Sequence, residues 1–321
     1  MITIDDLTGA RDRIAGHIRR TPLMSASRLG DTAGIFLSLK CESFQKTGSF
    51  KARGALNAIL KLDAAQKARG VITVSAGNHA QAVAFAATMA GVRSTVVMPA
   101  KASPLKVAAS RGYGADVMLH GSSSIEAFAR AKELEKERGL VFVHPFDDAN
   151  VCAGAGTVGL ELVDEDRAEM DTLVVSIGGG GLIAGIASAV RARGLKTRIV
   201  GVEPEGAAAM RKSLDAGRPM QLETIDTIAD GLSAPMAGEL TFPIVRDLVD
   251  DVVLVSDNEI RSAMRDLLSS AKLVAEPAAA AALAAVMEKR VGAQPGSRVV
   301  VVVSGGNVDL TRLAEIAAPG R

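Results

Sequence analysis

Residues 172–193 read TLVVSIGGGGLIAGIASAVRAR. The apolar run 172–177 is typical of a strand covered on both faces, and the Ala- and Ile-rich segment 182–193 is typical of a helix. Four consecutive glycines, Gly178, Gly179, Gly180 and Gly181, separate the two. A strand, a glycine turn and a helix form the unit from which parallel α/β sheets are built.

The same alternation continues through most of the chain. It predicts strands at residues 35–40, 71–75, 94–98, 117–119, 141–143, 172–177, 198–203, 252–255 and 299–304. It predicts helices at residues 50–62, 78–90, 105–111, 124–138, 182–193, 259–270 and 278–290. We therefore expect an α/β fold with two open, mostly parallel sheets flanked by helices.

The length of 321 residues fits a large and a small domain. A compact block of alternating strands and helices spans residues 71–143. We expect it to form a small domain, 69–148, inserted into a discontinuous large domain made of residues 1–68 and 149–321. In open α/β sheets, ligands bind at the carboxyl ends of the strands, so the loops after the strands are the candidate sites.

Composition excludes several classes of protein. The 37 basic and 36 acidic residues nearly cancel, which argues against a nucleic-acid partner. The longest apolar run, residues 278–287, is too short to span a bilayer. The acidic N-terminal segment does not resemble a signal peptide, and the two cysteines, Cys41 and Cys152, fit a reducing compartment. We expect a cytoplasmic protein without nucleic-acid or membrane partners.

The glycine turn is a candidate anion site. Glycines let several backbone N–H groups point at one spot, and the positive end of the following helix favours a phosphate there. The same turn contains Gly179-x-Gly181-x-x-Ala184, and Glu203 ends the next predicted strand. This spacing also matches a dinucleotide-binding fingerprint. Taken alone, the turn leaves both interpretations open.

A second strand-to-helix turn carries small and polar residues: Ser75, Ala76, Gly77, Asn78 and His79. Backbone N–H groups at a helix N-terminus, together with the Ser75 hydroxyl, can bind a carboxylate. In isolation, Asn78 and His79 would be read as capping and turn residues. Their place after a strand favours substrate binding.

A third segment places Lys51 in the first turn of a predicted helix. Most helical lysines are solvated, but the positive end of a helix lowers the pKa of a nearby amine. An unprotonated lysine is the nucleophile that forms Schiff bases. A lysine, a phosphate site and a carboxylate site together favour pyridoxal 5'-phosphate with an amino-acid substrate, because a nicotinamide enzyme has no use for the lysine.

Six segments in this order resemble the fold-type II pyridoxal-phosphate enzymes, in particular the serine/threonine dehydratase and serine racemase family. They are Lys40-Cys41-Glu42 with Gln45-Lys46-Thr47-Gly48-Ser49-Phe50-Lys51, residues 75–81, residues 178–181, Ile228-Ala229-Asp230-Gly231, Glu276-Pro277, and Ser304-Gly305-Gly306-Asn307. The resemblance covers almost the whole chain. It implies a homodimer.

The resemblance also implies roles for individual residues. Lys51 holds the cofactor through a Schiff base and then acts as the proton acceptor, Phe50 packs on the cofactor ring, and Asn78 binds the ring 3'-oxygen. Gly178, Gly179, Gly180 and Gly181 hold the phosphate. Ser304 faces the pyridine nitrogen, and Glu276 lies near the cofactor.

Ser304 favours one type of reaction. A carboxylate opposite the pyridine nitrogen would keep the nitrogen protonated and support long-lived carbanions. A hydroxyl does not enforce protonation, which suits prompt loss of a β-leaving group after Cα is deprotonated. The sequence thus predicts β-elimination.

The chain departs from the racemases at two positions. The racemases carry a serine where this chain has Ala76. The racemases also bind a divalent cation through the glutamate that matches Glu203 and an aspartate six residues later. This chain has Ala209 at the position of that aspartate. We therefore expect no metal and regard Glu203 as a doubtful ligand. The chain ends soon after the last predicted strand and a short helix, which argues against a feedback-controlled dehydratase.

We therefore expect an ammonia-lyase that converts L-threonine or L-serine to a 2-oxo acid and ammonia. The alternatives are a serine racemase, and a dehydratase for 3-hydroxyaspartate or a hydroxyectoine-derived substrate. A nicotinamide-dependent oxidoreductase and a non-catalytic binding module rank below these.

Overall fold

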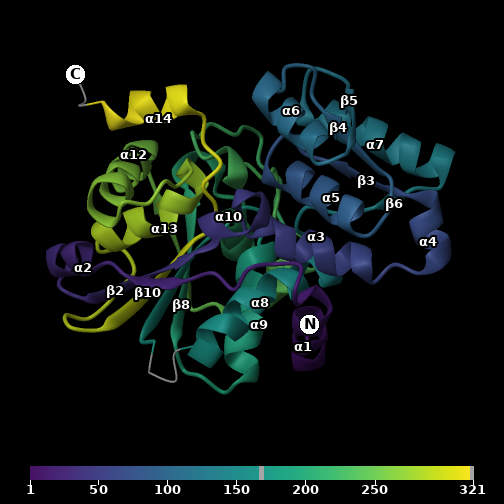
Figure 1. Cartoon of the computed structure of the whole chain (residues 1–321). Coiled ribbons are helices and arrows are strands. Elements are labelled where there is room, and N and C mark those ends of the chain that lie inside the picture. The colour runs from purple at the N-terminus through teal and green to yellow at the C-terminus, as the bar shows by residue number, and fades with distance from the viewer. Residues whose placement is uncertain (166–169, 319–321) are drawn as a thin grey trace.

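The computed structural model describes residues 1–165 and 170–318, and it contains two β-sheets flanked by helices (Figure 1). The larger sheet has six strands and the smaller has four. Among the described residues, β1 and β2 form the one antiparallel pair within these sheets. The predicted α/β class with two open, mostly parallel sheets is confirmed.

The larger sheet has the strand order β1-β2-β10-β7-β8-β9. Its strands are β1 (Leu23–Ser25), β2 (Phe36–Cys41), β10 (Arg298–Val303), β7 (Thr172–Ser176), β8 (Arg198–Pro204) and β9 (Asp251–Val255). Strand β10 runs parallel to both of its neighbours, and Val303 pairs with Cys41. The carboxyl ends of β2, β10 and β7 therefore meet at one edge of the sheet.

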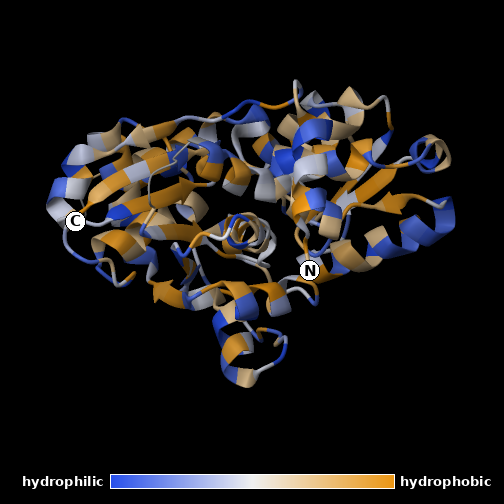
Figure 2. Ribbon diagram, turned by 90° about the horizontal axis from the view of Figure 1, so that it is seen from below, coloured by the Kyte–Doolittle hydropathy of each residue, from blue (hydrophilic) through white to orange (hydrophobic). Residues whose placement is uncertain are grey.

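Helices cover both faces of this sheet, as its apolar strands require. Alternate side chains of β10 enter opposite cores: Val299, Val301 and Val303 pack in one, and Val300 and Val302 in the other. The first core is closed by α2 (Ser27–Ala33), α12 (Asp257–Asp266) and α13 (Pro277–Met287), and the second by α8 (Ala149–Glu165), α9 (Gly181–Ala192) and α11 (Thr241–Leu248). Figure 2 shows apolar residues concentrated on the strands and polar ones spread over the outer helices.

The smaller sheet has the all-parallel order β5-β4-β3-β6. Its strands are β5 (Asp116–Leu119), β4 (Ser94–Met98), β3 (Val71–Val74) and β6 (Val141–Phe142), and its helices are α5 (Asn78–Met89), α6 (Pro104–Gly112) and α7 (Ser124–Arg138). Helix α3 (Lys51–Leu60) packs on α5 through Leu56, Ile59 and Val83. The division into domains at residues 69 and 148 stays a prediction.

All nine predicted strands are present, and no strand end is shifted by more than one residue. The sequence interpretation missed β1 and several helices: α1 (Ile4–Ile14), α2, α4 (Ala64–Arg69), α8, α10 (Ala209–Ala216) and α11. The short C-terminal helix is α14 (Leu310–Ala317). The remaining turns of helix are η1 (Glu42–Phe44), η2 (Lys46–Gly48), η3 (Glu205–Ala207), η4 (Asp230–Leu232) and the π-turn η5 (Leu267–Ala271), which ends the helix expected at 259–270.

Helix α8 was missed because its first half is rich in glycine, which disfavours helices. The glycines serve close packing instead. A Cβ atom at Gly154 would lie 2.5 Å from the carbonyl oxygen of Arg53, and one at Gly156 would lie 2.7 Å from that of Gly185. Helix α8 therefore contacts both α3 and α9 at the level of the backbone.

No helix among the described residues is both long enough and apolar enough to cross a membrane.

Candidate active site

Most of the predicted site residues lie in the segments that follow the carboxyl ends of strands in both sheets, whereas Glu276 directly precedes α13. Lys51 comes after β2, the four glycines follow β7, and Ser304 follows β10. The Ser75 turn follows β3, and the segment that begins at Val143 follows β6. This placement is the one that open α/β sheets favour for ligands.

Lys51 begins helix α3, where its side chain is half-buried. Its Nζ donates a hydrogen bond of 2.6 Å to the carbonyl oxygen of Pro145 and lies 5.0 Å from the centre of the Phe50 ring. Burial lowers the pKa of Lys51 to about 8, although the nearby charges of Cys152 and Glu276 act in the opposite direction. The direction agrees with the sequence-based expectation, but burial rather than the helix terminus is the main cause.

The glycine turn presents backbone donors at the start of α9. Gly180 has a φ of +94°, a conformation that residues with a side chain rarely adopt. In the part of the chain that the structure describes, no group accepts a hydrogen bond from the N–H of Gly178, Gly179 or Gly180. Together with the positive helix end, these donors suit a phosphate.

Close packing explains why glycine occupies the turn. A Cβ atom at Gly179 would lie 2.3 Å from the Phe146 ring, and one at Gly180 would lie 2.8 Å from Oγ1 of Thr241. The Thr241 hydroxyl donates a hydrogen bond of 2.6 Å to the carbonyl oxygen of Gly179. Because the peptide bond between Gly179 and Gly180 is trans, the N–H of Gly180 points to the side opposite that carbonyl, away from Thr241.

Residues Pro145 and Phe146 link Lys51 to the glycine turn, and the sequence analysis did not single them out. Pro145 accepts the bond from Lys51, and the next residue, Phe146, packs on Gly179. The Cys152 thiol donates to the carbonyl oxygen of Phe146 at 3.0 Å. The loop-like sequence HPFDD, residues 144–148, was the available signal, because loops after strands carry function.

Asn78, Glu276 and Asn307 form a chain of side-chain hydrogen bonds. Asn78 Nδ2 donates to Glu276 Oε1 at 2.6 Å, and Asn307 Nδ2 donates to Asn78 Oδ1 at 2.8 Å. Asn307 Nδ2 also donates to the carbonyl oxygen of Thr47 at 2.7 Å. Burial raises the pKa of Glu276 to about 7, and the bond from Asn78 opposes this shift. Asn307 was quoted as part of a motif but was not identified as a site residue.

The turn after β10 packs against the segment that leads into Lys51. The Phe50 N–H donates to the carbonyl oxygen of Ser304 at 3.0 Å, and the Gly306 N–H donates to that of Gly48 at 2.9 Å. Ser304 itself is buried. The structure therefore brings Phe50, Lys51 and Ser304 together, although they lie at opposite ends of the sequence.

In the predicted carboxylate-binding turn, residues 75–78 are half-buried, whereas His79 is buried. Ser75 Oγ accepts a hydrogen bond of 3.1 Å from the Gly77 N–H, and Ala76 and Asn78 are half-buried beside it. His79 instead lies in the core, with Nε2 3.0 Å from the carbonyl oxygen of Val143. Burial lowers the pKa of His79 to about 3, so the ring is neutral.

Glu203 has a structural partner. Its two carboxylate oxygens accept hydrogen bonds of 2.8 Å from the N–H groups of Met210 and Arg211, which lie in the first turn of α10. Burial raises the pKa of Glu203 to about 7. The described residues contain no group of three or more His, Cys, Asp or Glu side chains placed to hold a metal ion. Because Glu203 caps α10, it is also not free to bind a ribose, as the dinucleotide alternative requires.

Residues 14–305 match the family model described as pyridoxal-phosphate dependent enzyme. The chain belongs to this family. The resemblance to the fold-type II enzymes is confirmed, and so is pyridoxal phosphate as the cofactor. The residues present fit this cofactor, because a lysine with a lowered pKa and a turn of backbone donors are joined through Pro145 and Phe146.

Curated relatives match over nearly the whole chain. An L-threonine ammonia-lyase from Geobacter sulfurreducens is 47% identical over 97% of this chain and 77% of its own length. The catabolic L-threonine dehydratase TdcB of Escherichia coli K12 is 42% identical over 98% of this chain and 96% of its own.

Solved structures also match over nearly the whole chain. Maize serine racemase superposes with a TM-score of 0.93 at 41% identity and covers 98% of this chain and 96% of its own. A threonine deaminase from T.th. has a TM-score of 0.90 at 43% identity and covers 96% of this chain and 99% of its own.

Proposed function

We propose that this chain is an ammonia-lyase that converts L-threonine, and also L-serine, to a 2-oxo acid and ammonia. The observation that carries the proposal is the identity of 42–47%, over almost the full chain, to proteins named L-threonine ammonia-lyase or dehydratase. The site geometry supports it, because it combines an amine of lowered pKa with a row of backbone donors.

In this proposal, Lys51 both anchors the cofactor and moves the Cα proton. When bound, pyridoxal phosphate supplies an aldehyde for the amine and a conjugated ring that stabilises negative charge at Cα. A pKa of about 8 leaves part of the Lys51 amine unprotonated near neutral pH, so it can accept a proton. The adjacent Phe50 ring, 5.0 Å from Nζ, would pack on the cofactor ring and exclude water from one side.

The other proposed cofactor contacts surround Lys51. The N–H groups of Gly178, Gly179, Gly180 and Gly181 would bind the phosphate. Asn78 would bind the ring 3'-oxygen, with its amide held by Glu276. Ser304 would face the pyridine nitrogen. A hydroxyl there, rather than a carboxylate, supports β-elimination over reactions that need a long-lived carbanion.

The substrate carboxylate would bind at the turn formed by Ser75, Ala76, Gly77 and Asn78. This turn lies at the N-terminus of α5, a helix of 12 residues, whose positive end favours an anion. His79 begins the buried part of that helix. We propose that it holds the turn in place through its contact with the carbonyl oxygen of Val143.

Serine racemase is the second candidate, and the similarity to the maize enzyme favours it. Racemisation needs an acid on the face of the substrate opposite Lys51. The chain has Ala76 where the family resemblance places a serine in racemases. A methyl group cannot donate a proton, which supports elimination as the main reaction.

The test is a screen of purified holoenzyme with L-threonine, L-serine, 3-hydroxyaspartate and hydroxyectoine-derived amino acids. We expect release of ammonia and 2-oxo acid in equal amounts, fastest with L-threonine. Faster conversion of L-serine to D-serine than to pyruvate would contradict the proposal.

We also propose a cytoplasmic homodimer in which residues 69–148 form the small domain and residues 1–68 and 149–321 the large one. The support for the dimer is the family resemblance, and the support for a reducing compartment is that both cysteines are buried and free. Sedimentation velocity at several protein concentrations tests the dimer. A species of one chain at micromolar concentration would contradict it.

A further inference from the structure

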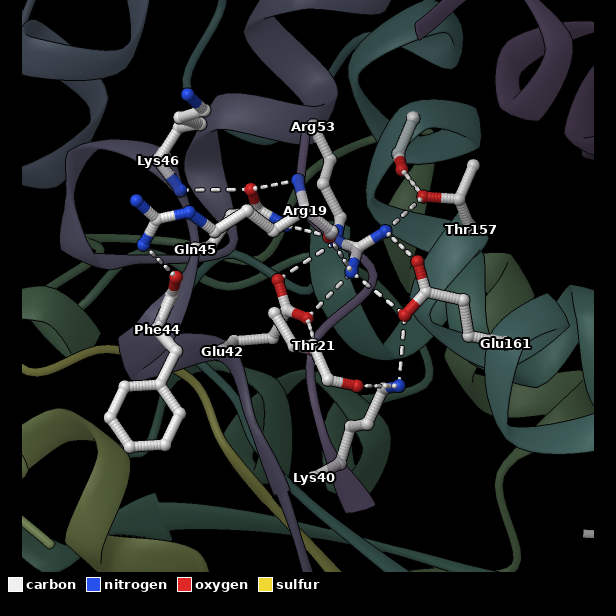
Figure 3. A network of polar contacts seen from close by, with 11 residues as sticks. Arg19, Thr21, Lys40, Glu42, Phe44, Gln45, Lys46, Arg53, Thr157 and Glu161 are labelled. Atoms are coloured by element: carbon white, nitrogen blue, oxygen red, sulfur yellow. Dashed lines mark hydrogen bonds and ion pairs between the residues drawn. The ribbon is translucent and has the colours of Figure 1, made fainter. Parts of the chain in front are cut away.

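Figure 3 shows a cluster of buried charged side chains around Arg53 of helix α3. Arg53 follows Lys51 by two residues, which is a rotation of about 200° around a helix, so the two side chains leave opposite sides of α3. Lys40, Glu42 and Arg53 have 0% exposure. We call Lys40, Glu42, Arg53, Thr157 and Glu161 the Arg53 cluster.

The carboxylates of Glu42 and Glu161 each accept two hydrogen bonds from the guanidinium of Arg53. For Glu42, the distances are 2.8 Å from Nε to Oε2 and 2.7 Å from Nη2 to Oε1. For Glu161, they are 2.6 Å from Nη1 to Oε1 and 3.0 Å from Nη2 to Oε2. Thr157 Oγ1 accepts from Nη1 at 3.1 Å. A paired fork of this kind fixes both the position and the plane of an arginine.

Lys40 is the second cation of the cluster. Its Nζ lies 2.8 Å from Glu161 Oε2 and donates to the carbonyl oxygen of Thr21 at 2.7 Å. Among the residues that the structure describes, the cluster thus pairs two cations with two carboxylates in a region with almost no access to water. The cluster joins strand β2 (Lys40), η1 (Glu42), α3 (Arg53) and α8 (Thr157 and Glu161).

The segment that precedes Lys51 is anchored nearby. Gln45 Nε2 donates to the carbonyl oxygen of Arg19 at 2.7 Å, and Gln45 Oε1 accepts from the N–H groups of Arg19 and Lys46 at 2.9 and 2.8 Å. Lys51 thus lies between two fixed points, Gln45 before it and Arg53 after it.

Stability alone does not account for such a cluster. Removing charges from water costs free energy that ion pairing repays only in part, and apolar replacements of buried ion pairs are often as stable. Bidentate pairs do provide a fixed geometry. Arg53 belongs to the first turn of α3, the turn that also carries Lys51. A fixed geometry at this turn therefore acts directly on the position of Lys51.

We infer that Arg53 is a positioning residue: held by Glu42 and Glu161, it fixes the first turn of α3 against β2 and α8 and so keeps the Lys51 amine beside Pro145, shielded from water. This inference rests on the proposed role of Lys51. If α3 loosened, water would reach the amine, and its pKa would move back toward that of an ordinary lysine.

The substitution Arg53→Lys tests the inference, because it keeps the charge but removes the planar fork. The matched control is Arg191→Lys in α9, whose guanidinium binds the carbonyl oxygens of Leu248 and Thr197 and the carboxylate of Asp250, away from Lys51. The groups whose charges act on Lys51, Cys152 and Glu276, stay unchanged in both variants, and so do His79 and His144, whose pKa values Lys51 lowers.

The main readout is the pH midpoint at which Lys51 of the apoprotein reacts with an amine-acylating reagent, followed by peptide mass spectrometry. We expect the midpoint to lie near 8 in the wild type and in Arg191→Lys, and to rise by about one unit in Arg53→Lys. We also expect kcat of the loaded enzyme to fall about tenfold with little change in KM. All measurements are made well below each melting temperature.

An unchanged midpoint in Arg53→Lys, with only a lower melting temperature, would overturn the inference and leave the cluster a structural role. If Arg53→Lys does not fold, Glu161→Gln carries the same test, because Glu161 is the partly exposed member of the cluster. Failure of the Lys51 assignment itself is distinguishable: the labelling needs no cofactor, whereas a Lys51→Ala variant that still bound pyridoxal phosphate covalently would refute the assignment.

Discussion

The side-chain amide of Asn78 donates a hydrogen bond of 2.6 Å to the carboxylate of Glu276, across a sequence separation of 198 residues. Asn78 is the first residue of α5, beside the smaller sheet, and Glu276 is the N-cap of α13, on the larger sheet. The bond therefore couples the two halves of the candidate active site. Since the carboxyl of Glu276 is buried, its protonation changes both the bond and the stability of the fold.

Glu276 should make the apoprotein less stable as the pH rises. Its pKa of about 7 in the folded state exceeds the ordinary value of 4.5. A carboxyl with a raised pKa contributes stability that is fully present below pH 4.5 and is lost as the pH rises through 7. Replacing Glu276 with Gln removes this loss, so the variant should gain up to about 3 kcal/mol relative to wild type between pH 5 and pH 8.

Urea unfolding of the apoprotein across this pH range measures the effect. Glu288→Gln is the matched control, because Glu288 is exposed at the other end of α13. A free-energy difference between wild type and Glu276→Gln that stayed constant from pH 5 to pH 8 would contradict the prediction.

Replacing Lys51 with Ala should abolish turnover and leave the fold intact. The substitution removes the proposed cofactor anchor and the proposed proton acceptor together, so kcat should fall by about 10³-fold or more. Lys212→Ala, at an exposed position of α10, is the control and should keep full activity. Formation of 2-oxo acid by Lys51→Ala at close to the wild-type rate would show that another group performs the reaction.

Replacing Gly180 with Ala should weaken cofactor binding more than it slows the loaded enzyme. A Cβ atom there would lie 2.8 Å from Thr241 Oγ1, so the turn would have to move and its N–H groups would lose their alignment. Gly217→Ala is the matched control: Gly217 also has a positive φ, +69°, but a Cβ atom would meet nothing within 4 Å. Both variants lose about 1–2 kcal/mol of backbone stability, so a difference in cofactor affinity between them reports the displacement of the turn at Gly180.

Equilibrium titration with pyridoxal phosphate gives the affinities of the two glycine variants. We expect at least a tenfold rise in Kd for Gly180→Ala and none for Gly217→Ala. Equal affinities would argue that the glycine turn does not bind the phosphate.

The sequence was sufficient to predict the sheets and the loops, but not the contacts between distant segments. Apolar runs such as residues 299–303 identify buried strands because both faces of the sheet are covered. The glycine turn was equally clear, since few other turns require four glycines. By contrast, the sequence around Pro145 and Asn307 does not reveal what these residues contact, because their roles depend on which carbonyl or amide the fold brings within 3 Å of Lys51 or Asn78.

Two of the sequence interpretations failed because contacts between distant segments cannot be seen in the sequence. Helix α8 was missed because helix propensity disfavours glycine, whereas backbone contact with α3 and α9 requires it at Gly154 and Gly156. Glu203 could be interpreted as a metal ligand or a ribose ligand because sequence spacing does not reveal hydrogen bonds. Its carboxylate in fact binds the N–H groups of α10.

Removal of divalent cations should therefore have little effect. Both oxygens of Glu203 are engaged by Met210 and Arg211, which leaves too few oxygen ligands for a tight Mg²⁺ or Ca²⁺ site. Dialysis against a chelator should leave the melting temperature and kcat unchanged. Glu203→Ala should instead destabilise the protein by about 1–2 kcal/mol, because α10 loses its cap. A large loss of activity on chelation, restored by Mg²⁺, would disprove this prediction.

Replacing Ala76 with Ser should introduce racemisation. Lys51 serves one face of the substrate, and D-serine forms only if a second group returns a proton to the opposite face of Cα. Ala76 lies in the turn between β3 and α5, half-buried beside Ser75 and Gly77, and it offers only a methyl group. A serine there adds one hydroxyl at the position that the resemblance assigns to the racemase acid. The wild type should eliminate the β-hydroxyl of L-serine with little or no D-serine, and Ala76→Ser should form detectable D-serine while part of the elimination persists.

The competing explanation is that a small residue at position 76 only allows the turn to close around the substrate carboxylate. Ala76→Gly is the matched control, because it keeps the turn small without adding a hydroxyl. Chiral chromatography of L-serine reactions separates the two explanations: the hydroxyl accounts for racemisation only if D-serine appears with Ala76→Ser and not with Ala76→Gly. If Ala76→Ser is simply a slower dehydratase, steric closure is the correct explanation. Rapid D-serine formation by the unmodified enzyme would refute the assignment of Ala76 altogether, since the proton donor would then lie elsewhere on that face.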